Sequence, residues 1–182
     1  MRLFVALNLP PEERERIYRA AAPLRRAELP VRLTREPALH LTLRFLGEVE
    51  PAALEDLERA IAAAVAIVTP FTLRLGGTGA FPSLSRPRVL WVGVEAAPEL
   101  LALHAALERR LEPLGIAREP GPFRPHLTLG RVRRGAALRG IATLLEEIHF
   151  AASLRVTEVE LMRSHLTPEG SRYELLRTFP LG

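Results

Sequence analysis

Hydrophobic and polar positions follow two different periods along the chain, and the two periods alternate. Residues 2–10 (RLFVALNLP) form a short apolar run closed by prolines, which predicts a strand. Residues 10–30 begin with proline, carry acids in the first turn and arginines toward the end, which is typical of a helix. The run 40–49 predicts a second strand, and the proline-led segment 51–68 predicts a second helix.

The second half of the chain repeats this order. Residues 71–83 predict a strand that runs into a glycine-rich turn, and 88–115 read as strand, proline and amphipathic helix. A further helix is expected over 136–147. Residues 152–181 predict a hairpin of two strands around the turn Thr-Pro-Glu-Gly.

The tetrapeptide HLTL occurs twice, at 40–43 and again at 126–129. Val5 and Val92 precede the two copies at nearly equal distances, so strand, proline, helix, loop and HLTL recur as one unit. Such a repeat indicates internal duplication. We therefore predict an α+β fold with two similar lobes around a central cleft, related by a pseudo-twofold axis. Each lobe is expected to hold its own mostly antiparallel sheet, with its first strand paired to its HLTL strand.

No segment is rich enough in glycine and serine to separate independent domains, so residues 1–182 are predicted to form a single bilobal domain. On a strand, His40 and Thr42 point to one face while the leucines between them point to the other, and the same holds for His126 and Thr128. Burying these polar groups unpaired would cost roughly 1–3 kcal/mol each. The two polar faces are therefore expected to face a shared cleft.

Two imidazoles and two hydroxyls in one cleft suit the chemistry of a phosphodiester. One histidine can act as general base and the other as general acid, while the hydroxyls donate hydrogen bonds to phosphate oxygens. Arg44, counted along the strand, shares the face of His40 and Thr42, and Arg124 lies two residues before His126. Both arginines are predicted to contribute to phosphate binding.

The composition indicates which ligands and cofactors the protein could bind. All 25 basic residues are arginine, the net charge is +4 and the sequence pI is about 10.7. Guanidinium groups pair with phosphate oxygens, so affinity for polyanions is one interpretation, and genome composition is the other. There is no cysteine and no His/carboxylate cluster with ligand spacing, so neither a metal nor another cofactor is predicted. The scarcity of amide and sulfur residues suggests a heat-adapted source.

The sequence also predicts where the protein is found in the cell. No apolar run is long enough to cross a membrane and the charged start is unlike a signal peptide, so a cytoplasmic protein is predicted.

The remaining histidines are not expected to be catalytic. His165 repeats the pattern as HLTP, but Pro168 follows it closely, which favours a strand end rather than a catalytic position. His104 is expected on a helix and His149 at a helix-to-strand junction, both without a catalytic role.

The sequence resembles the two-histidine phosphoesterase superfamily, specifically RNA 2′,3′-cyclic phosphodiesterases, also called 2′-5′ RNA ligases. The resemblance covers essentially the whole chain and rests on RLFVALNLP, HLTLRFLGEV, PRVLWVGV, FRPHLTLGRV and LMRSHLTPEGSRYELL. It implies metal-independent hydrolysis of an RNA 2′,3′-cyclic phosphate end to a 2′-phosphate. It also implies a reversible 2′-5′ joining of tRNA halves. By the family pattern His40 is the proton donor, His126 the proton acceptor, and Thr42 and Thr128 hold the phosphate.

Two other classes stay open at this point. A non-catalytic RNA-binding module would use the same basic cleft, although the low aromatic content of 5% offers few base-stacking platforms. A related phosphodiesterase would act on a small cyclic nucleotide or on 2′,5′-linked oligonucleotides. The implied partner is RNA with a cyclic phosphate end; no membrane and no obligate protein partner are implied.

Overall fold

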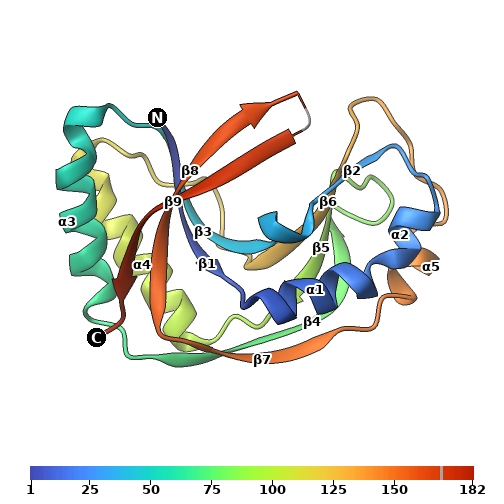
Figure 1. Ribbon diagram of the computed structural model, residues 1–182, viewed down its shortest axis with the longest axis horizontal. Helices are drawn as coiled ribbons and strands as arrows, with labels where there is room; N and C mark the ends of the chain where they lie inside the picture. Colours follow the sequence, from blue (N-terminus) through green and yellow to red (C-terminus); the bar gives the residue numbers. More distant parts are fainter. Residues whose placement is uncertain (169) are drawn as a thin grey trace.

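The computed structural model describes residues 1–168 and 170–182, which form an α+β fold around one nine-stranded sheet (Figure 1). The strand pairs among these residues are antiparallel. The strands are β1 (Arg2–Asn8), β2 (Val31–Leu33), β3 (His40–Glu48), β4 (Phe71–Phe81), β5 (Val89–Val94), β6 (His126–Val132), β7 (Ala151–Val156), β8 (Glu158–Thr167) and β9 (Gly170–Pro180).

The sheet consists of two halves with the same internal order. Along it the strands run β7-β4-β5-β6-β3-β1-β8-β9, and β2 pairs with β6 at the side. In each half the HLTL strand pairs with the first strand of its own repeat, β3 with β1 and β6 with β5, as predicted. The expectation of two separate sheets is wrong. A backbone pairing at Leu41 and Leu127 joins β3 to β6, so the halves form one continuous sheet.

The helices are α1 (Pro11–Ala20), α2 (Ala22–Arg26), α3 (Leu54–Val65), α4 (Pro98–Leu111) and α5 (Ile141–Glu146), with short 3-10 turns at Glu36–Ala38, Pro51–Ala53 and Glu112–Leu114. Helices α3 and α4 begin close to where the sequence predicts, whereas the segment 10–30, predicted as one helix, contains the two helices α1 and α2. Proline opens α1 and α4, where its missing N–H costs no hydrogen bond. Glutamates in the first turn of both helices interact favourably with the positive end of the helix dipole.

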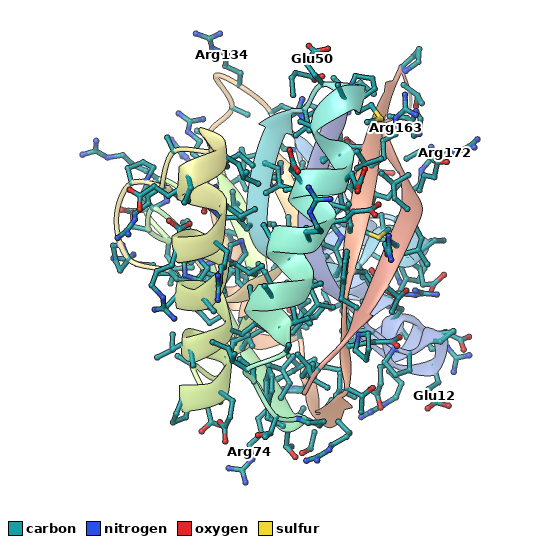
Figure 2. The ribbon with its side chains drawn as sticks, turned by 90° about the vertical axis from the view of Figure 1, so that its left-hand side faces the viewer. Glu12, Glu50, Arg74, Arg134, Arg163 and Arg172 are labelled. Atoms are coloured by element: carbon teal, nitrogen blue, oxygen red, sulfur yellow. The ribbon has the colours of Figure 1, made fainter. Side chains whose placement is uncertain are left out.

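Two groups of helices cover the two halves of the sheet. Figure 1 shows α3 and α4 beside the half that holds β1, β3, β8 and β9, and α1, α2 and α5 beside the other half. Seen from the side in Figure 2, α3 and α4 lie next to each other in front of the strands, and the two helices pack together. Helix α1 follows β1 in the sequence but lies beside the half that holds β4 and β7, and α4 follows β5 but lies beside the half that holds β1 and β3. Both helices therefore cross from one half of the sheet to the other.

The central strand β1 is buried on both faces. Leu3, Val5 and Leu7 belong to the large core beneath the helices. Phe4 and Ala6 point the other way and pack with Met162 and Tyr173 in a second, smaller cluster. The apolar run RLFVALN reflects this double burial, since alternation is lost when both faces of a strand are covered. The smaller cluster forms the floor beneath the polar face of β3.

The sequence missed or misplaced three elements. Helix α5 is shorter than the predicted 136–147. Gly140, which directly precedes it, has φ +70°, and a residue in this left-handed conformation cannot be part of a right-handed helix, so the helix begins after it. The segment predicted as a hairpin contains three strands, since β7 precedes the confirmed pair β8–β9. Strand β2 was not predicted.

Among the described residues, no helix is long and apolar enough to span a membrane.

Candidate active site

The two HLTL strands bring their polar side chains into one cleft. His40, Thr42, His126 and Thr128 all line it, and its volume is about 270 Å³. Each strand follows the same burial order, with half-buried His and Thr alternating with buried Leu. The leucines anchor both strands in the large core, so the histidines and threonines are turned toward the cleft as predicted.

The strand register fixes how the four groups lie relative to one another. Leu41 pairs with Leu127 in an antiparallel ladder. The neighbouring positions on the opposite face therefore place His40 across from Thr128 and Thr42 across from His126. The two histidines lie on a diagonal, where Cα atoms of a regular sheet are about 7–8 Å apart. This diagonal puts one imidazole on each side of a space bounded by both hydroxyls.

Both imidazoles are oriented by backbone carbonyls two residues earlier. Nδ1 of His40 lies 2.8 Å from the carbonyl oxygen of Ala38, and Nδ1 of His126 lies 2.7 Å from that of Arg124. A carbonyl only accepts, so each Nδ1 carries the proton, and in the neutral ring each Nε2 is the unprotonated nitrogen. Thr42 Oγ1 lies 3.0 Å from Nε2 of His40 and donates to it when that imidazole is neutral. The atoms available for proton transfer are thus the two Nε2 nitrogens.

The cleft disfavours positive charge on both rings. Burial lowers the pKa of His40 from its ordinary value of 6.5 to about 4, against the Ala38 hydrogen bond, and the charges of Arg131 and His126 lower it further. Burial also lowers the pKa of His126, with Arg131 contributing in the same direction. Both imidazoles are therefore mainly neutral near pH 7 in the empty cleft. A bound phosphate anion would favour their protonation, because an opposite charge raises a histidine pKa.

Arg44 does not lie in the cleft, and the sequence-based prediction for it is wrong. The pairing of β1 with β3 shifts register between Val5 and Ala6, so Leu43 has no partner and forms a β-bulge. A bulge reverses the alternation beyond it. Arg44 is consequently only 3% exposed and forms ion pairs with the largely buried Glu108 and with Glu119, which is 40% exposed and lines the cleft.

An equivalent β-bulge in β6 brings an arginine that the sequence analysis did not predict into the cleft. The pairing of β5 with β6 shifts register between Leu90 and Trp91, opposite Leu129. Simple alternation from His126 would turn Arg131 toward the core, whereas beyond the bulge it lines the cleft. It lowers the pKa of both histidines, which places its charge near both. The equivalent position in β3 is Phe45, which also lines the cleft.

Gly130 shows why the two copies differ at the bulge. It is the counterpart of Arg44, and a Cβ there would lie 2.7 Å from Val31 Cγ1, too close for a side chain. Only glycine lets β2 approach β6 at this point. The arginine that follows can then reach both the cleft and the face of β2.

Arg124 lines the cleft as predicted, at the edge next to His126. Its carbonyl orients the ring of His126, so its backbone position is fixed while its side chain is exposed. Its expected contact with phosphate stays a prediction.

Aromatic rings hold the imidazoles from the side. His40 lies between Phe4 and Tyr173, with ring centroids 4.9 and 5.0 Å away, and His126 meets the Phe81 ring edge to face at 4.9 Å. Such contacts restrict ring rotation and exclude water from one side of each imidazole.

The remaining histidines lie outside the cleft, as expected. Nε2 of His165 forms a 2.7 Å hydrogen bond with Glu174 Oε2 across the β8–β9 hairpin. His104, on α4, stacks on Phe123 with centroids 4.0 Å apart. His149 is exposed between α5 and β7. Within residues 1–168 and 170–182, no three His, Cys, Asp or Glu side chains gather as a metal site would require.

Two histidines, two threonines and an arginine line one cleft on a duplicated antiparallel sheet, and these are the groups that a phosphoesterase working through proton transfer requires. A family model described as "2′-5′ RNA ligase superfamily" matches residues 10–168, and the chain belongs to this superfamily.

Individual relatives agree with the family match. A protein of Methanothermobacter thermautotrophicus named RNA 2′,3′-cyclic phosphodiesterase is 32% identical over 100% of this chain and 99% of its own length. The crystal structure of TT0787 of Thermus thermophilus has a TM-score of 0.83 at 36% identity, covering 100% of this chain and 98% of that one. E. coli LigT complexed with 3′-AMP has a TM-score of 0.77 at 31% identity, covering 99% and 97%.

Proposed function

We propose that residues 1–182 act as one catalytic domain that hydrolyses 2′,3′-cyclic phosphate ends of RNA to 2′-phosphomonoesters without a metal ion. The observation that carries this proposal is the diagonal placement of two imidazoles in one cleft with two hydroxyls, each ring with its Nδ1 bound to a backbone carbonyl. The relatives named RNA 2′,3′-cyclic phosphodiesterase support the same substrate.

The reaction opens a strained five-membered ring. Water attacks phosphorus and gives its proton to Nε2 of His126, the proton acceptor. The bond from phosphorus to the 3′ oxygen breaks, and that oxygen takes the proton from Nε2 of His40, the proton donor. The product carries the phosphate on the 2′ oxygen and a free 3′ hydroxyl, while the two histidines exchange protonation states and reset through solvent.

The threonines and arginines would act on the phosphate rather than on the protons. Negative charge accumulates on the non-bridging oxygens as water adds, and donors aimed at those oxygens stabilise the transition state. Thr42 and Thr128 supply hydroxyl donors, and Arg131 supplies a positive charge from β6. Thr42 donates to His40 in the empty cleft, so it must turn to the phosphate when substrate arrives. Arg124 extends the positive rim of the cleft.

The bound phosphate also prepares the acid. With a pKa of about 4 in the empty cleft, His40 is a neutral ring at pH 7. The anionic substrate raises that pKa, and the hydrogen bond from Nδ1 to Ala38 stabilises the imidazolium further. The enzyme therefore forms its reactive protonation state together with the substrate.

A panel of three measurements tests this function against the alternatives. The protein would be incubated with cytidine 2′,3′-cyclic phosphate and with an RNA that ends in a 2′,3′-cyclic phosphate, and a 2′,5′-linked dinucleotide would serve as the third substrate. Turnover of the RNA end supports the proposal. Binding without turnover would favour an RNA-binding module, and turnover restricted to the mononucleotide or to the 2′,5′ linkage would favour the smaller-substrate enzymes.

Joining would use the same ring-opening step with a different nucleophile. If the 5′ hydroxyl of a second RNA replaces water, His126 accepts its proton and a 2′-5′ linkage forms. A reversible joining of tRNA halves would follow from this geometry, and incubation of cyclic-phosphate and 5′-hydroxyl fragments tests it. The cytoplasmic location stays a prediction.

A further inference from the structure

A second, larger depression opens beside the catalytic cleft. We call it the basic groove and define it by Arg32, Thr34, Arg35, Arg131, Ser171 and Tyr173. Its volume is about 520 Å³ against about 270 Å³ for the cleft. Thr34, Arg131 and Tyr173 line both, so the groove is continuous with the site of chemistry. An extended ligand with its end in the cleft would have to pass this way or leave toward solvent.

The groove contains two arginines that face each other across a strand pair. Arg32 of β2 is the direct partner of Arg131 of β6 in the antiparallel register. Opposed side chains share one face, with Cα atoms about 4.5–5.5 Å apart, and like charges in this position destabilise a sheet. Among residues 1–168 and 170–182, neither side chain forms an ion pair or hydrogen bond with a carboxylate. An anion between the two guanidinium groups would relieve their repulsion.

Arg35 continues the positive line away from the cleft. It is exposed and immediately precedes the 3-10 turn Glu36–Ala38, whose last carbonyl orients His40. No acidic residue lies among the described residues that line the groove, and the hydroxyls of Thr34 and Ser171 add neutral donors. Arg172 borders the groove too, but its side chain extends outward from the β8–β9 hairpin (Figure 2). A chain of anionic groups leading out of the cleft fits this lining.

We infer that the basic groove binds the single strand of RNA on the 5′ side of the cyclic phosphate, with Arg32 and Arg35 on its phosphodiesters. The inference rests on the proposed function, which places the terminal phosphate between His40 and His126. Arg131 then stands at the junction of terminal nucleotide and strand, and Arg32 meets the next phosphate outward. The groove would thus make an oligonucleotide a better substrate than a mononucleotide, with Arg32 and Arg35 as specificity determinants.

The test compares two substrates in one pair of variants. The double variant Arg32→Gln/Arg35→Gln removes both charges and keeps polar side chains of similar reach. The control Arg110→Gln/Arg155→Gln makes the same charge change at exposed positions of α4 and β7, outside the residues that line the groove. For each protein kcat/KM is measured on a single-stranded RNA hexamer ending in a 2′,3′-cyclic phosphate and on cytidine 2′,3′-cyclic phosphate.

The readout is the ratio of kcat/KM for the hexamer to kcat/KM for cytidine 2′,3′-cyclic phosphate. We expect the groove variant to lower the ratio on the order of tenfold through KM for the hexamer, and the control to leave it unchanged. The slope of log KM against log salt should also fall by roughly 1.4, about 0.7 for each lost contact to a single strand. An unchanged ratio, an equal loss on both substrates, or the same loss in the control would overturn the inference.

A binding measurement separates this inference from the proposed function. Fluorescence anisotropy of a labelled RNA hexamer ending in a 2′-phosphate reports binding whether or not the protein turns over substrate. Weaker, less salt-dependent binding in the groove variant would support the groove even if the wild-type protein failed to hydrolyse cyclic phosphate, which would overturn the function alone. Equal affinity in both double variants would overturn the groove alone.

Discussion

Leu41 and Leu127 are direct cross-strand partners, and their pairing joins the two halves of the sheet. On the face opposite these leucines, the antiparallel register sets the two histidines on one diagonal and the two threonines on the other. A duplicated strand thus becomes a site in which acid and base approach a phosphate from different sides. Neither half contains such a site alone.

The first prediction concerns the division of work between the histidines. His40→Ala and His126→Ala should each lower kcat at least ~10²-fold, the lower end of what general acid–base catalysis contributes. The double variant should lose much less than the product of the single losses, because the groups act as a unit. Steady-state kinetics on the cyclic-phosphate RNA gives all three values. Near-normal activity in either single variant would rule out the paired mechanism.

The second prediction concerns the hydroxyls. Thr42→Val and Thr128→Val keep the shape of the side chain and should each depress kcat on the order of 10²-fold, the typical loss of one preorganised donor. Thr42→Val should in addition raise the pKa of His40, since the hydroxyl that donates to neutral Nε2 is gone. Titration by NMR measures that shift. A change confined to KM would show that the hydroxyls bind only the ground state.

The third prediction separates the two arginines that the β-bulges place differently. Arg44→Met should lower the free energy of unfolding by about 3–5 kcal/mol, because it leaves the largely buried Glu108 without its cation. Arg131→Gln, at an exposed position, should change stability by less than about 0.5 kcal/mol but reduce kcat/KM at least ~10-fold. Urea denaturation and kinetics on both variants check this. The reverse pattern would contradict the assigned strand faces.

The fourth prediction concerns pH. The productive free enzyme carries one proton on the histidine pair, so kcat/KM should be bell-shaped, with limbs set by the pair rather than by either ring. Both pKa values are lowered from 6.5, that of His40 to about 4, so the maximum should lie below pH 6.5 and kcat/KM should fall as pH rises above it. Initial rates at low substrate concentration, measured across the pH range, give this profile.

Substrate charge and Arg131 give this profile two internal controls. The phosphate raises both pKa values, so the alkaline limb of kcat should lie at higher pH than that of kcat/KM. Arg131→Gln removes a cation that lowers the pKa of both rings, so it should move the alkaline limb of kcat/KM upward. A limb that stays in place would show that Arg131 lies outside the reach of the histidines.

Much of this site was predictable because its chemistry follows local rules. The period-2 alternation around His40 and His126 identified the polar face, and the strand–proline–helix order identified the duplication. Alternation failed directly beyond Leu43 and Leu129, because one unpaired residue reverses the faces of the residues next to it, and no residue type marks a β-bulge. That reversal explains both the misplaced Arg44 and the missed Arg131.

The joining of the halves had no sequence signal either. Which two strands pair at Leu41 and Leu127 depends on how the connecting helices cross over, and that is a property of tertiary packing. The short β2 was hidden for a related reason, since three residues carry too little periodicity to read. Its register opposite β6 is nevertheless what creates the pair Arg32 and Arg131.

The chemical identity of the product tests the central claim most directly. An RNA ending in a 2′,3′-cyclic phosphate would be incubated with the protein after exhaustive EDTA treatment, and the products resolved by chromatography against 2′- and 3′-phosphate standards. With His40 protonating the 3′ oxygen and His126 activating water, the account predicts undiminished turnover to the 2′-phosphate alone. A mixture of 2′- and 3′-phosphates, or activity that returns only with a divalent ion, would contradict it.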